Sequence, residues 1–102
     1  MLLNVLQVVN DYQGNPIIDE TNNSRTFRDL AMYVCNTFSK GEDPTPDVKS
    51  RLFQISLKLW QADSSGNADF SVEELALIKE RAGRVGLPLI AGRIAEIIES
   101  VK

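Results

Sequence analysis

Residues 63–74 read DSSGNADFSVEE and carry oxygen-bearing side chains at nearly every second position. Calcium is held by oxygen ligands, and a twelve-residue loop supplies them from positions 1, 3, 5, 7, 9 and 12, the last being a bidentate glutamate. In this stretch those positions are occupied by Asp63, Ser65, Asn67, Asp69, Ser71 and Glu74. The spacing therefore raises the hypothesis of a calcium site.

With the helical patterns on either side, this stretch resembles an EF-hand, and the resemblance implies a single degenerate calcium-binding module. It departs from the family at two points: Ala68 replaces the turn glycine, and positions 3 and 5 are the neutral Ser65 and Asn67. Alanine at positive φ is strained, and two acidic ligands hold a divalent ion more weakly than four. If Ala68 has a negative φ, and Asp63 and Glu74 point apart, the stretch is only a connection.

A helix start explains the same residues. Ser71 and Glu74 have the spacing of a capping box, and Phe70 can pack on Leu75 as a hydrophobic staple. The polar residues before them, with Gly66, are typical of a turn that follows a helix end. We therefore predict no metal site and no cofactor, with the calcium module as the alternative.

The composition bounds the class of protein. The 102 residues, 43% of them hydrophobic and 25% charged, fit one domain that spans residues 1–102. The net charge of −3 disfavours nucleic acid as the main partner, since phosphate binding needs a concentrated basic surface. Histidine is absent, which removes the commonest general base and zinc ligand, so no catalytic residues are predicted.

The cysteine count and the lengths of the apolar runs indicate where in the cell the protein is found. Cys35 is the single cysteine, and the chain opens without a basic segment followed by an apolar run and a small-residue cleavage site. No run reaches the roughly 18 apolar residues that a membrane-spanning helix needs. We expect a soluble protein in the reducing cytoplasm, with Cys35 as inert packing.

The pattern of elements predicts an α+β fold that is mostly α. An apolar opening, the turn QGNP and the pair Ile17-Ile18 indicate a β-hairpin over residues 1–20. The part from residue 26 to 102 is expected to be helical. Capping residues and apolar stripes place four helices at about residues 26–39, 46–62, 71–85 and 88–101. The third helix is expected to turn Lys79, Glu80, Arg81 and Arg84 outward.

The second helix, expected to be the central one, has two apolar faces. One is made by Val48, Leu52, Ile55, Leu59 and Ala62, and the other by Phe53, Leu57 and Trp60. In a domain of this size we predict that both faces pack into the core. The alternative is that Phe53 and Trp60 are exposed as anchors for a protein partner.

Basic residues lie on both sides of the break before the fourth helix. Arg84 and Arg93 could bind an anion or nucleotide at its start, where backbone donors converge. Their spacing matches neither a Walker loop nor a dinucleotide fingerprint. Solvated helix faces are the simpler interpretation.

The order of elements is similar to that of a group of small proteins encoded by tailed bacteriophages and prophages. The likeness is carried by NDYQGNPIID, TFRDLAMYV, LFQISLKLWQAD and DFSVEELALIKERAGRVGLPLIAGRIAEIIE, and extends from Asp11 to Glu99. The likeness implies that the protein acts in the host cytoplasm or in the virion. It implies no functional residues. We expect a non-enzymatic protein that binds a protein partner or itself, in virion assembly or in modulation of a host factor.

Overall fold

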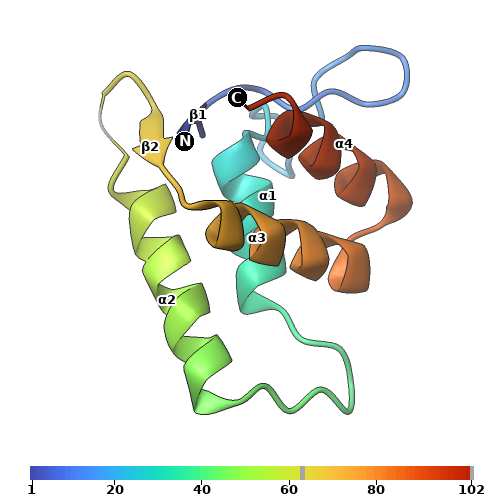
Figure 1. The fold of residues 1–102 in the computed structure, drawn as a ribbon. Coiled ribbons are helices and arrows are strands. Elements are labelled where there is room, and N and C mark those ends of the chain that lie inside the picture. Colours follow the sequence, from blue (N-terminus) through green and yellow to red (C-terminus); the bar gives the residue numbers. More distant parts are fainter. Residues whose placement is uncertain (63, 102) are drawn as a thin grey trace.

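The computed structural model describes residues 1–62 and 64–101. Its elements are β1 (Leu2–Asn4), α1 (Phe27–Asn36), α2 (Pro46–Trp60), β2 (Asn67–Asp69), α3 (Val72–Val85) and α4 (Pro88–Glu99) (Figure 1). The α+β, mostly α prediction is confirmed, with an antiparallel hairpin near the N-terminus and four helices after it. No helix in this part of the chain is both long and apolar enough to cross a membrane.

The predicted hairpin turn lies between Asn10 and Pro16, which face each other in an antiparallel bridge. The N–H of Ile17 donates to the carbonyl of Val9 at 2.9 Å. The Asp11 carboxylate accepts from the backbone inside the turn, as an Asx-turn does. The pairing around this turn consists of isolated bridges and does not form a regular two-stranded sheet.

The strand β1 pairs with β2, a partner that the sequence did not indicate. The antiparallel register sets Leu3 opposite Ala68, and both side chains are buried. Next to this pair, the N–H of Val5 donates to the carbonyl of Gly66 at 2.8 Å. Gly66 has φ +84°, and a Cβ there would lie 2.5 Å from Oδ1 of Asn4, so this approach needs glycine.

The helix starts follow the predicted caps. Thr26 accepts from Asp29 in a capping box, and Thr45 caps α2 ahead of a proline in the first turn. The box formed by Ser71 and Glu74 is also present. The first helix ends at Asn36 rather than near residue 39, since the next residue is extended.

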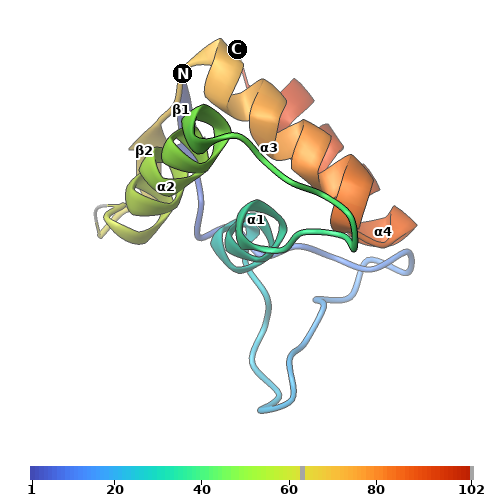
Figure 2. The ribbon, with the colours of Figure 1, turned by 90° about the horizontal axis from the view of Figure 1, so that it is seen from below.

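The central helix is α1, not α2. It contacts α2, α3 and α4, and Figure 2 shows α2 and α3 diverging on one side of it. Its inward residues Phe27, Ala31 and Val34 are fully buried. Both α2 and α3 therefore rest on α1 and separate from each other.

Arg81 is buried, which corrects the expectation that it faces solvent. It is 4% exposed, and its guanidinium donates to the carbonyls of Val34 at 3.4 Å and Thr37 at 2.5 Å. The same group pairs with Glu42 at 2.5 Å and lies 4.5 Å from the centre of the Phe38 ring. Arg81 thus satisfies carbonyl groups that the end of α1 leaves open.

The single thiol is also part of the core. Cys35 is 1% exposed, and burial raises its pKa to about 12, against a smaller opposing effect of Arg81. A thiolate is the reactive form of cysteine, so this side chain is unreactive in the folded protein.

Candidate functional site

The loop glutamate that would close a calcium site is engaged in other contacts. Oε1 of Glu74 accepts from the N–H of Ser71 at 2.8 Å and from Nζ of Lys58 at 2.6 Å. Burial alone would raise the pKa of Glu74, but these hydrogen bonds outweigh it and lower the pKa. The carboxylate therefore fixes the start of α3 and joins it to α2.

Two other loop positions, Asp69 and Ala68, depart from the arrangement of a calcium loop. Oδ1 of Asp69 lies 2.6 Å from the amino group of Met1, whose hydrogen bond lowers the pKa of Asp69. Ala68 lies in β2 and does not have a positive φ. Ser65 and Asn67 are exposed, and Asp63 lies outside the described residues. Within residues 1–62 and 64–101, no three or more Cys, Asp or Glu side chains are grouped so as to hold a metal ion.

We expect that calcium chloride at about 5 mM leaves the melting temperature unchanged, several times above the roughly 1 mM at which weak sites fill. The reason is that a bound ion would have to displace Lys58 and the N–H of Ser71 from Glu74. Differential scanning fluorimetry measures this, with magnesium chloride at equal ionic strength as the control. A saturable stabilisation by calcium that Glu74→Gln abolishes would contradict the expectation.

Arg84 and Arg93 do not converge on one anion site. Arg84 pairs with Glu80 at 3.1 Å. Arg93 donates to the carbonyls of Asn10 at 2.9 Å and Asp11 at 2.7 Å. The two side chains line different hollows of the surface. Arg93 instead ties the N-terminal hairpin to α4.

Two large aromatic side chains of α2 face solvent. Phe53 is 58% exposed and Trp60 69%, so the prediction of core packing is wrong for both. Their exposure agrees with the alternative, and the role of anchors for a protein partner stays a prediction. The helix is anchored by Leu52, Ile55 and Leu59, which are buried. Phe53 and Trp60 are seven positions apart, which puts them on one side of α2 at about 10 Å along its axis.

Two cations accompany these rings. The guanidinium of Arg28, on α1, lies 5.5 Å from the centre of the Trp60 ring. Lys49 precedes Phe53 by one helical turn. Among residues 1–62 and 64–101, neither cation has a carboxylate within ion-pair distance. We call Arg28, Lys49, Phe53 and Trp60 together the aromatic face.

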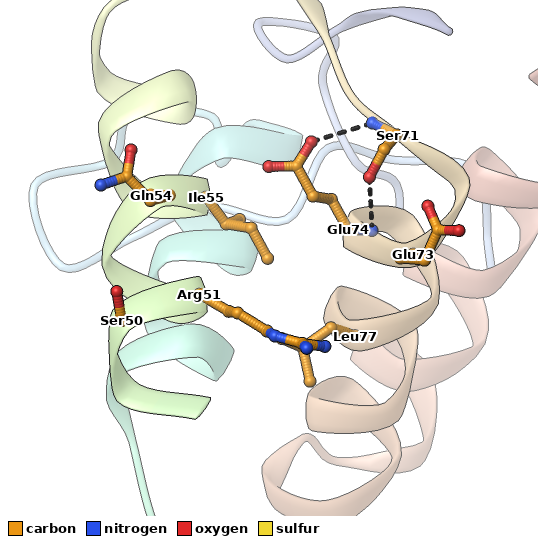
Figure 3. A pocket seen from close by; sticks show the side chains of 8 residues that line it. All are labelled: Ser50, Arg51, Gln54, Ile55, Ser71, Glu73, Glu74 and Leu77. Carbon is orange, nitrogen blue, oxygen red and sulfur yellow. Dashed lines mark hydrogen bonds between the residues drawn. The ribbon is translucent and has the colours of Figure 1, made fainter. Parts of the chain in front are cut away.

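A groove runs between α2 and α3. Figure 3 shows Arg51 and Ile55 extending from α2 toward Leu77 and Glu74 of α3. The hollow there has a volume of about 380 Å³. It is lined by Ser50, Arg51, Gln54, Ile55, Ser71, Glu73, Glu74 and Leu77.

A second hollow of about 250 Å³ continues this groove past Leu77. It is lined by Glu42, Asp43, Pro44, Val48, Leu77, Glu80, Arg81 and Arg84. We call the two hollows together the α2–α3 groove. Asp43 and Glu73 have no cation within ion-pair distance in the described part of the chain.

The sequence does not indicate this groove. Apolar spacing showed which residues of each helix turn inward, but the groove depends on the angle at which α2 and α3 diverge over α1. Asp43 and Glu73 on its rim look in sequence like ordinary solvated positions. Searches against protein families, curated proteins and solved structures found no match to the chain.

Proposed function

We propose that this chain is a small non-enzymatic protein of a phage or prophage that binds another protein through its aromatic face, in virion assembly or in modulation of a host factor. The observation that carries the proposal is the exposure of Phe53 and Trp60 on a helix whose other side is firmly packed. Leaving such a side chain in water forgoes about 1.5–3 kcal/mol of burial free energy. Aromatic residues and arginine are also the commonest energetic anchors of protein interfaces.

A non-enzymatic role agrees with the use of the reactive side chains. The Cys35 thiol is buried with a pKa of about 12, and Glu42 and Glu74 are each paired with a cation and a backbone N–H. The chain contains no histidine that could serve as a base for a nucleophile.

Affinity capture from a phage-infected host tests the proposal. The wild type is expected to retain a defined partner. The double variant Phe53→Ala/Trp60→Ala should recover at least tenfold less of that partner. Tyr12→Ala is the matched control, because Tyr12 is 76% exposed and belongs to the hairpin turn, which Arg93 ties to α4. Equal recovery by the double variant, or recovery of no partner by the wild type, would count against the proposal. Circular dichroism of each variant verifies that the fold is kept.

A further inference from the structure

We propose that the aromatic face of one copy docks into the α2–α3 groove of a second copy, so that the chain associates with itself head to tail. This inference rests on the proposed function, in which the aromatic face is a protein-binding surface, and it names a second copy of the chain as a partner. It is carried by three observations: spacing, charge and the positions of the two surfaces on α2.

The spacing of the projections agrees with that of the hollows. Phe53 and Trp60 are about 10 Å apart along α2, from a helical rise of about 1.5 Å per residue. On α3, the two hollows lie on either side of Leu77, with linings that run from Glu73 to Arg84. By the same rise the centres of those linings are roughly 9 Å apart along α3. One ring can therefore enter each hollow.

The unpaired charges are complementary. The aromatic face carries Arg28, which lies over the Trp60 ring, and Lys49, which precedes Phe53 by one helical turn; neither has a carboxylate partner within residues 1–62 and 64–101. The groove carries Glu73 at one hollow and Asp43 at the other, and the described part of the chain offers neither a cation partner. Docking would give each of these four charges an opposite neighbour, which favours this orientation of the two copies.

The two surfaces lie on nearly opposite sides of α2. Arg51 and Ile55 point into the groove, and Phe53 is two positions from each, which is about 200° around the helix (Figure 3). One copy can therefore use both surfaces at once, with two different neighbours. Such a contact is heterologous and builds rings or open chains. A symmetric dimer through two aromatic faces would instead bring two copies each of Arg28 and Lys49 together.

Complementary variants test the contact. The face variant is Phe53→Ala/Trp60→Ala, and the groove variant is Asp43→Lys/Glu73→Lys; all four residues are exposed, so the fold should survive. Sedimentation velocity is run at protein concentrations up to about 1 mM, so that even weak association is detected. Under these conditions the wild type is expected to form species larger than a dimer. Each variant alone should be monomeric. Mixed in equal amounts they should form a 1:1 dimer and nothing larger, because one functional face and one functional groove remain.

A charge exchange adds a second arm. Arg28→Glu/Lys49→Glu alone should abolish association. The chain that combines these changes with Asp43→Lys/Glu73→Lys should associate at least tenfold more tightly than the chain with Arg28→Glu/Lys49→Glu alone. A wild type that is monomeric at about 1 mM overturns the inference, as does a pair of variants that fail to dimerise when mixed. If a partner from infected cells still binds through Phe53 and Trp60 while the chain is monomeric, the proposed function stands and only self-association is rejected.

Discussion

Replacing Arg81 by methionine is expected to lower the free energy of unfolding by about 3–5 kcal/mol, the usual cost of removing one partner from a buried ion pair. Methionine keeps much of the apolar stem and deletes the guanidinium, which donates to Val34, Thr37 and Glu42. The loss leaves two carbonyl groups at the end of α1 without that donor. Urea denaturation followed by circular dichroism measures the change. In a domain of this size it corresponds to a fall in melting temperature of more than about 10 °C.

Arg84→Met is the matched control. Arg84 lies one turn further along α3, and its side chain is 59% exposed in the pair with Glu80. Exposed pairs of this kind contribute about 0.5 kcal/mol or less. Equal stability losses in the two variants would show that the guanidinium of Arg81 does not hold the end of α1.

The pH profile gives this contact a second signature. Hydrogen bonds from Arg81, and then the N–H of Ser39, lower the pKa of Glu42 from 4.5 to about 2. A carboxylate with a lowered pKa in the folded state stabilises the protein above its unfolded pKa, and that contribution is lost as the pH falls from about 5 to about 2. Glu42→Gln should therefore flatten the profile in this window, as should Arg81→Met. If the slope is unchanged in both variants, the Arg81–Glu42 pair is not the source of the pH dependence of stability.

The helices could be predicted because their signals are local. Thr26, Thr45 and Ser71 each cap a helix within the next three residues, and the apolar stripes repeat at helical spacing. The hairpin turn is also local, since Asp11 bonds to the backbone inside it. These features need no knowledge of the rest of the chain, so spacing and residue type suffice.

The features that the sequence could not show are long-range. Leu3 pairs with Ala68 across most of the chain, and neither segment carries a signal for the other. Arg81 looks like a solvated position on α3 until the end of α1 is placed beside it. The same holds for Phe53 and Trp60, because an apolar residue on a second helix face is buried or exposed according to what covers it. Here Phe53 stays 58% exposed and Trp60 69%.

Phe70→Ala is expected to lower the free energy of unfolding by about 3–5 kcal/mol, the range for removing a buried aromatic ring. Phe70 is 1% exposed and precedes the cap of α3, with Leu75 buried at the fourth helical position. Its N–H donates to the carbonyl of Met1 at 3.0 Å, so it also stands where the β1–β2 pairing meets α3. Its backbone therefore joins two parts of the fold, and the loss of the buried ring leaves a cavity beside their junction.

The matched control for this change is Phe53→Ala, the same substitution in the same chain at a ring that is 58% exposed. It should change the stability of the isolated protein by about 0.5 kcal/mol or less, as surface substitutions usually do. The two variants separate the roles of the aromatic residues: Phe70 stabilises the fold without reaching a partner, while Phe53 is available to a partner without stabilising the fold. If Phe53→Ala destabilised the monomer as much as Phe70→Ala, Phe53 would belong to the core, and the aromatic face would lose the observation on which both proposals rest.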